Sequence, residues 1–271
     1  MGFFGRKRAP SVPHPRKEPR FDGPLTLERL EQIFQDCVDF TKRPVSLGEG
    51  GACTLTLCYL SGMVKMERVS DYVLRPLAQD EALARCGTPR QAMEEMMGGA
   101  LYNLSAAERT TLDEAAFDLV AGWCLLFFPG ESAVLSLFVG TEEKRSISSP
   151  SNETVLKGSR DAFVESLRTN TSIVRRHLKT PELRIREQVV GRQSVTSVDI
   201  LYIEGLTNPH LVEQVAAQLA DIDIDAVLAT GNIEEYIVPA ARTAFPLVQY
   251  TERSDRFCAG LAEGRVGILI H

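Results

Sequence analysis

Two short stretches decide the fold: LCYLSGM at residues 57–63 and ILYIEGL at residues 200–206. Tyr59 in the first aligns with Tyr202 in the second, 143 residues later, and each tyrosine is followed three positions on by a glycine. Each stretch is apolar, as in a buried strand, and the next segment has apolar residues at helical spacing. We therefore expect, twice in the chain, a strand that ends at a glycine and leads into a helix.

A second pair of stretches repeats at almost the same interval. Residues 119–128 read LVAGWCLLFF and residues 261–270 read LAEGRVGILI, with Gly122 and Gly264 aligned 142 residues apart. Two independent matches at nearly one spacing indicate an internal duplication. The sequence predicts an α/β fold of two similar α/β subdomains, each a small mixed sheet with flanking helices.

A polar segment marks the boundary between the two copies. Residues 141–154 read TEEKRSISSPSNET, a composition typical of a connection. We expect a first subdomain over residues 25–147 and a second over residues 148–271. The second should begin with a long helix over residues 159–179, which has an apolar stripe and basic residues near its C-terminal end.

The first copy continues beyond its aligned stretch. Residues 129–140 read PGESAVLSLFVG, which predicts a β-hairpin with Pro129 and Gly130 in the turn. The second copy reaches His271 where the corresponding turn would begin, so we expect the natural protein to be longer.

The N-terminal residues differ in character from the rest of the chain. Residues 1–20 contain six basic residues, one acid and four prolines, a local net charge of +5 in a chain of net charge −6. We expect residues 1–24 to form a disordered basic tail, because prolines disfavour regular elements. Either the tail is only solvated, or it lies near an anionic membrane surface, where each basic residue contributes about 1 kcal/mol.

Composition and motifs exclude several classes of function. The acidic excess, 36 acids against 30 basic residues, argues against nucleic acid as the main partner. No run of 18 apolar residues predicts a membrane span within this sequence. The six cysteines lack CxxC spacing, which favours free thiols in a reducing compartment. Motifs of common hydrolases, phosphate loops and zinc sites are missing, so we expect no enzyme activity, no metal and no cofactor.

Two polar clusters supply the candidate functional residues. One lies on the predicted helix at 159–179, and the other precedes a later helix, with Thr251 as a candidate N-cap. Asparagine is a poor choice for a helix interior, and arginine offers a planar fork of donors that lysine lacks. An interface between the two copies or between protomers fits these residues, and so does a solvated helix face. The candidates are Arg160, Glu165, Asn170, Arg175, Arg176, Thr251, Glu252, Arg253 and Asp255.

The second copy resembles a known family. The segment at residues 150–237, from PSNETVLKGSRDAFVESLRTNTSIVRRHLK to NIEEYI, and the segment FPLVQYTERSDRFCAGLAEGRVGILI at residues 245–270 look like the GerA-type spore germination receptor A subunit family. The likeness is strong over residues 145–271 and weak over the first copy. It includes the helix with the first polar cluster and the TER segment at Thr251–Arg253.

The resemblance implies more than composition shows. Members of this family have a cytoplasmic N-terminal region of two α/β subdomains, followed by a multi-pass membrane domain that this sequence lacks. They are expected on the core side of the spore inner membrane, with a transporter-like B subunit and a lipoprotein C subunit as partners. The A subunit is expected to form a homo-oligomer that conducts ions when nutrients trigger germination. The candidate residues would then serve assembly and gating.

Two alternatives stay open at this point. The chain could belong to a component similar to stage V sporulation protein AF, a related channel subunit that does not itself sense nutrient. It could also be a small-molecule-sensing domain with ligand held between the two subdomains, since ligands favour domain interfaces.

Overall fold

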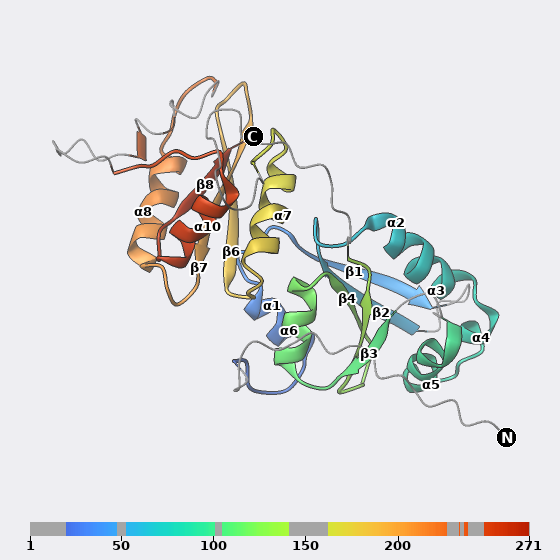
Figure 1. Ribbon diagram of the computed structural model, residues 1–271. Coiled ribbons are helices and arrows are strands. Elements are labelled where there is room, and N and C mark those ends of the chain that lie inside the picture. The colour runs from blue at the N-terminus through green and yellow to red at the C-terminus, as the bar shows by residue number, and fades with distance from the viewer. Residues whose placement is uncertain are drawn as a thin grey trace. The chain divides into compact units, whose positions relative to one another are not determined.

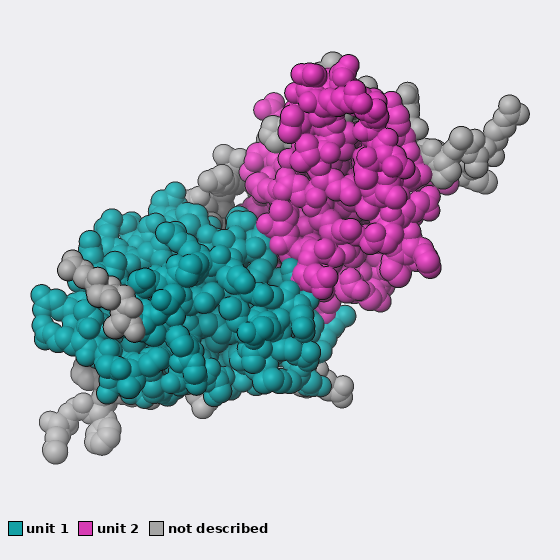
Figure 2. Space-filling view, turned by 180° about the vertical axis from the view of Figure 1, so that it is seen from behind, with its two compact units in different colours: residues 1–34, 39–142 teal, residues 35–38, 143–271 magenta. Residues whose placement is uncertain are grey.

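The computed structural model describes residues 20–47, 53–100, 105–140, 162–226, 233, 236–237 and 247–270. The candidate Arg160 and nearly all of the predicted N-terminal tail lie outside these residues. The chain forms two compact units, coloured separately in Figure 2. Unit 1 comprises Met1–Phe34 and Asp39–Glu142, and unit 2 comprises Gln35–Val38 and Glu143–His271. Within the described residues, no helix is long and apolar enough to cross a membrane.

Unit 1 contains a five-stranded sheet in which all neighbouring strands are antiparallel and the strand order is β1-β2-β4-β5-β3. The predicted hairpin over residues 123–138 is confirmed, because β4 and β5 pair directly and Gly130 in their connection has a φ of 78°. The strands are β1 (Phe40–Leu47), β2 (Cys53–Leu60), β3 (Ala106–Arg109), β4 (Trp123–Phe127) and β5 (Val134–Phe138).

Helices cover both faces of the unit 1 sheet (Figure 1). Two helices, which contact each other, lie on one face, and a run of short helical segments lies on the other. The first pair is α1 (Leu27–Ile33) and α6 (Leu112–Val120). The second layer contains α2 (Met66–Val69), the π-helical η1 (Ser70–Leu74), α3 (Arg75–Gln79), α4 (Glu81–Ala84), α5 (Pro89–Glu95) and the π-helical η2 (Met96–Ala100).

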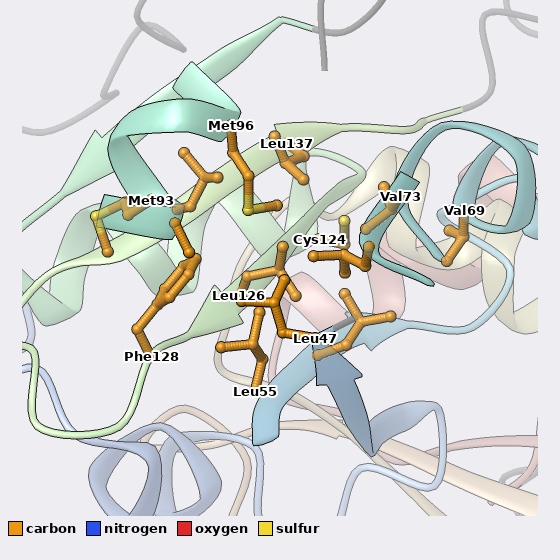
Figure 3. Packing of buried hydrophobic residues seen from close by; sticks show 14 of the residues in the cluster. Leu47, Leu55, Val69, Val73, Met93, Met96, Cys124, Leu126, Phe128 and Leu137 are labelled. Atoms are coloured by element: carbon orange, nitrogen blue, oxygen red, sulfur yellow. The ribbon is translucent and has the colours of Figure 1, made fainter. Parts of the chain in front are cut away.

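The unit 1 core follows from the two-residue period of its strands. Leu55 and Leu57 of β2 are fully buried against the layer of short helices, and Leu126 of β4 packs beside them (Figure 3). Cys58, the residue after Leu57, is also fully buried and points to the opposite face, where α1 and α6 lie. Residues 57–60 of β2 are buried on both faces, as a sheet covered on both sides requires.

Unit 2 has the same three-layer arrangement around a smaller antiparallel sheet of order β6-β7-β8. Helices α7 and α10 pack on one face of this sheet and α8 packs on the other (Figure 1). The strands are β6 (Leu183–Val190), β7 (Thr196–Ile203) and β8 (Gly267–Ile270). The helices are α7 (Leu167–His177), α8 (Pro209–Ala220) and α10 (Ser254–Ala262).

The expected internal duplication is confirmed in the positions of the elements. The bounds of β6 and β7 are those of β1 and β2 shifted by 143 residues, and the bounds of α10 are those of α6 shifted by 142. Tyr59 and Tyr202 therefore occupy the same position in equivalent strands, and each packs on the helical layer that follows its strand.

The duplication extends to the strand register. Leu57 of β2 lies opposite Leu126 of β4. The residues at the shifted positions, Ile200 of β7 and Ile268 of β8, lie opposite each other in the same way. Because a register slip of one residue would exchange the two faces of a strand, matched register means that both units bury corresponding side chains on corresponding faces.

One helix starts later than the sequence pattern predicts. The pattern indicated a helix from residue 159, but α7 begins at Leu167 with Ser166 as its N-cap, and residues 162–165 precede it without helical structure. Two contacts hold the preceding segment out of the helix: the Phe163 N–H bonds to the Glu252 carbonyl, and the Val164 backbone bonds to the side chain of Asn170 on α7, as described below.

Candidate functional site

Asn170 holds the backbone of the segment that enters unit 2. Its side chain is 3 % exposed, on the second turn of α7. Its Oδ1 accepts from the Val164 N–H at 2.8 Å, and its Nδ2 donates to the Val164 carbonyl at 2.7 Å. An asparagine supplies one donor and one acceptor side by side, which is what a peptide backbone in extended conformation needs. This pairing explains a residue that is otherwise unfavourable in a helix.

The same segment also bonds to the chain just before α10. The Phe163 N–H donates to the Glu252 carbonyl at 2.9 Å, and Ala162 forms an antiparallel bridge with Arg253. The Phe163 ring packs edge-on against Phe257 of α10, with ring centroids 5.2 Å apart. The segment at residues 162–164 is thus fixed from α7 on one side and from the start of α10 on the other.

Arg253 and Asp255 form a two-pronged ion pair at the start of α10. Arg253 Nε donates to Asp255 Oδ1 at 3.0 Å, and Nη2 donates to Oδ2 at 2.6 Å. The side chains are 20 % and 33 % exposed, so this pair is partly shielded from water. The Arg253 guanidinium lowers the pKa of Asp255 below its ordinary value, and an additional bond from the Arg256 N–H acts in the same direction.

Two further contacts complete the start of α10. Thr251, which the sequence suggested as the N-cap, instead accepts from the Arg253 N–H through Oγ1 at 3.1 Å, and Arg253 itself occupies the N-cap position. Ser254, fully buried at the first helical position, places its Oγ 3.2 Å from His177 Nε2 at the end of α7. We refer to residues 162–164, Asn170, His177 and 251–255 together as the unit 2 polar cluster.

The structure places the remaining candidates differently. Arg175 on α7 is fully buried, with no accessible surface. Arg176 is exposed and bonds through Nη2 to Ser172 Oγ at 3.2 Å, one turn earlier on the same helix. Glu165 is exposed beside the helix start. Asn170, Thr251, Glu252, Arg253 and Asp255 therefore come together, whereas Glu165 and Arg176 lie on the exposed surface.

Sequence reasoning missed one buried carboxylate in unit 2. Asp199 has no accessible surface although it lies in the apolar strand β7, and its Oδ2 accepts from Arg168 Nη1 at 3.2 Å. Arg168 also pairs with Glu187 of β6, with Nη2 2.6 Å from Oε2. A lone acid inside the apolar run SVDILYI was the available signal, because a buried charge in a strand requires a partner.

Metal and thiol chemistry have little support in the described part of the chain. No group of three or more His, Cys, Asp or Glu side chains there is arranged to hold a metal ion. Burial raises the pKa of the Cys58, Cys124 and Cys258 thiols to about 12. Because the thiolate is the reactive form, these three cysteines are poor nucleophiles and serve as core residues.

Comparison with known proteins identifies the family. The profile described as "Bacillus/Clostridium GerA spore germination protein" matches residues 28–271, which include both units. The chain belongs to the GerA family. Within that match lie both copies of the duplication and the whole unit 2 polar cluster, so the resemblance suggested by the second copy extends to the first.

Several proteins of Bacillus subtilis (strain 168) are similar to this GerA family chain. "Uncharacterized membrane protein YfkQ" is 36 % identical over 242 residues, or 89 % of the chain and 46 % of that protein. "Spore germination protein KA" is 32 % identical over 234 residues, or 86 % of the chain and 42 % of that protein. "Stage V sporulation protein AF" is 30 % identical over 217 residues, or 80 % of the chain and 43 % of that protein. The chain thus spans less than half the length of these relatives.

A solved structure shares the fold. The N-terminal domain of the A subunit of the Bacillus megaterium spore germinant receptor GerK3 matches with a TM-score of 0.70 and 27 % identity, over 90 % of this chain and 89 % of that one. This GerA family chain is therefore similar in fold to the N-terminal domain of a germinant receptor A subunit. The expected fold class, two similar α/β subdomains with flanking helices, is confirmed by the same match. The expectation of mixed sheets was wrong, because all paired strands of both sheets are antiparallel.

Proposed function

We propose that this chain is the cytoplasmic N-terminal domain of a spore germinant receptor A subunit, and that it serves assembly of the receptor and gating of an attached membrane ion channel. The observation that supports this most is the likeness over nine-tenths of both chains to the N-terminal domain of the GerK3 A subunit. The longer relatives, which include spore germination and membrane proteins, support attachment to a membrane domain.

The unit 2 polar cluster is the proposed transmitting element. It joins three pieces of chain: the segment at residues 162–164, helix α7 directly after it, and the start of α10, which is distant from both in sequence. Because paired and partly buried hydrogen bonds have defined geometry, a displacement of any one piece must move the other two or break bonds. Such a junction can pass a change at a partner surface to the rest of the domain, with no catalytic step and no cofactor.

The proposed partners follow from the family. A transporter-like B subunit and a lipoprotein C subunit would complete the receptor, and further A subunits would form a homo-oligomer. The site of action would be the core side of the spore inner membrane. The relatives include both spore germination proteins and stage V sporulation protein AF, and the proposed channel role is compatible with either kind of protein.

The test replaces Arg253 by alanine, and separately by lysine, in the full-length protein in spores. Lysine keeps the charge but cannot form the two-pronged bond with Asp255. Arg192→Ala is the matched control, because Arg192 also pairs with an aspartate, Asp223, but both side chains are about two-thirds exposed. The measurements are the amount of the protein in the spore membrane and the rate of nutrient-triggered germination.

We expect both Arg253 variants to accumulate normally and to germinate more slowly, with Arg192→Ala unchanged in both measurements. Germination at the normal rate in Arg253→Ala would place the pair among ordinary surface charges. Loss of the protein from the membrane in both variants would show that the pair serves folding alone, which contradicts a transmitting role.

A further inference from the structure

The two edges of the unit 2 sheet differ in what the described residues place beside them. At the β6 edge, the segment Asp36–Val38 runs alongside, with the Val38 N–H donating to the Ile185 carbonyl and the Ile185 N–H donating to the Asp36 carbonyl, each at 3.0 Å. At the other edge, no described strand pairs with the outer side of β8. Unpaired edges bind other strands unless they are blocked by proline, a bulge or charge, and β8 reads Gly-Ile-Leu-Ile.

Unit 1 shows how an equivalent edge is covered. Its strand β4 corresponds to β8 and pairs on its outer side with β5, from Trp123 opposite Phe138 to Phe127 opposite Val134. Strand β5 follows β4 in the same chain after the short connection at residues 128–133. The covering strand is therefore delivered from the polypeptide itself through a tight turn.

The side chains of β8 differ from their unit 1 counterparts in the manner expected of a missing neighbour. Cys124, Leu126 and Phe128 in unit 1 are 0 %, 0 % and 4 % exposed. The residues 142 positions later, Val266, Ile268 and Ile270, face the same side of the sheet but are only partly buried. Isoleucine and valine side chains that stay partly exposed, where the matching side chains of unit 1 are buried, have apolar surface left to cover.

We propose that the outer edge of β8 binds one more antiparallel strand with apolar residues at alternate positions, and that this strand comes from the same polypeptide, as β5 does in unit 1. The register is that of β4 and β5, so the strand would lie across Ile268 as Leu135 lies across Leu126. The relatives have more than twice as many residues as this chain matches, so family members contain sequence that can supply such a strand.

The direct test is hydrogen exchange on the full-length protein. In an antiparallel sheet, backbone N–H groups of an edge strand that point outward exchange freely, and pairing protects them. We expect the amides of residues 267–270 to be protected in the full-length protein about as well as those of residues 123–127, the internal reference. In the 271-residue chain, the outward amides of β8 should exchange at least about tenfold faster. Equal, fast exchange of β8 in both proteins overturns the proposal.

A graft tests the edge without the rest of the protein. The ten residues 129–138, which form the turn and strand after β4, are appended directly after Ile270 in place of His271. We expect the appended strand to protect the β8 amides and to raise the melting temperature. The matched control carries Leu135→Pro and Leu137→Pro in the appended copy, since proline cannot donate within a sheet and cannot restore protection. Equal protection with both appended sequences contradicts strand pairing.

The source of the strand is tested by the concentration dependence of β8 amide protection in the full-length protein. Same-chain delivery predicts protection that does not change on dilution, because the covering strand is part of the same chain. Protection that falls on dilution would show that a second copy occupies the edge, which overturns the assignment to the same polypeptide. None of these measurements involves germination, so the strand-pairing proposal can fail while the proposed function holds, and the reverse is also true.

Discussion

Equivalent positions on helices α6 and α10 are occupied by Asp118 in unit 1 and Gly260 in unit 2. Asp118 is 2 % exposed, and its Oδ2 accepts from Arg109 Nε and from Ser136 Oγ, both at 2.7 Å. Arg109 lies on β3 and Ser136 on β5. Among the described residues, unit 2 has no strand equivalent to either.

This difference shows which features are common to both copies of the duplicated fold and which are present in one copy only. Strand register, the glycine turns and the two helical layers are common to both units, so they belong to the scaffold. The buried ion pair occurs only where extra strands supply its partners, because a carboxylate removed from water requires bonded counterparts. The unit 2 polar cluster is the corresponding addition in the second copy.

The largest effect should come from removing the buried carboxylate of unit 1. Asp118→Ala leaves Arg109, whose side chain is 13 % exposed, without its ion pair, and we expect a loss of about 3–5 kcal/mol in the unfolding free energy of unit 1. Trp123 is the single tryptophan of the chain and lies under the Arg109 guanidinium, 5.9 Å from the ring centroid, so its fluorescence reports this unit.

The control for that variant is Asp223→Ala, which removes an exposed ion pair in unit 2 and should cost about 0–1 kcal/mol. A loss below about 1 kcal/mol in Asp118→Ala would mean that the buried pair is dispensable, and the contrast between the units would lose its energetic basis.

Next in size are the two glycines that end the equivalent helices. Gly122 and Gly264 have φ values of +88° and +85°, and an added Cβ would lie 3.0 Å from the Met63 carbonyl oxygen and 3.1 Å from that of Leu206. Gly122→Ala and Gly264→Ala should each cost about 2 kcal/mol or more, from backbone strain and a close contact together. Denaturant unfolding of each variant measures this.

Gly205→Ala measures the cost of backbone strain without a close contact. Its φ is +75°, and no atom lies within 4 Å of the added Cβ, so we expect a cost of about 1 kcal/mol. Similar losses in unfolding free energy at positions 122 and 264 would support the equivalence of the two units, whereas an alanine tolerated at only one of them would contradict it.

A smaller effect is expected at Asn170, a feature of unit 2. Asn170→Ala leaves the N–H and carbonyl of Val164 without these partners, and we expect a loss of about 1–3 kcal/mol together with faster exchange of the Val164 amide. Thr169→Ala, which removes only a hydroxyl bonded to the exposed Ser166, is the control. Unchanged exchange at Val164 would show that Asn170 does not fix the segment before α7.

The smallest effect concerns pH. The pKa of Asp255 is lowered in the folded protein, chiefly by the bond from Arg253, so its contribution to stability is present above the ordinary value of 3.8 and is lost as pH falls through the lowered folded value. Wild-type unit 2 should therefore lose more stability than Arg253→Gln on going from about pH 5 to pH 2. Identical pH profiles of the melting temperature would contradict the coupling.

Much of the scaffold could be predicted from local sequence. Tyr59 and Tyr202 lie in matching strands because apolar runs that end at a glycine specify buried strands and tight turns without information from the rest of the chain. The hairpin around Gly130 was predictable for the same reason. The start of α7 was not, since the helical pattern of residues 159–166 yields to the bonds between Val164 and Asn170.

The candidate site was predicted only in part. Asn170 and Arg253 were unusual enough for their positions to be noticed, and their side-chain partners Val164 and Asp255 lie nearby in sequence. The backbone contacts of residues 162 and 163 with Arg253 and Glu252 join positions far apart in sequence, and no local pattern indicates them. Ser254 and His177 meet across 77 positions of sequence, and neither belongs to a recognisable motif. The burial of Asp199 is explained by its bond from Arg168 on α7, a contact that only the tertiary structure shows.

The sequence by itself determined the duplication, because that depends on spacings along the chain, and the likeness of its segments to known proteins indicated the family. The tertiary structure alone decided the order of strands in each sheet, the partners of the buried charges and which edge has no described neighbour. Those depend on contacts between residues far apart in sequence, and the free energy of such a contact is set by burial and geometry that exist only in the folded chain.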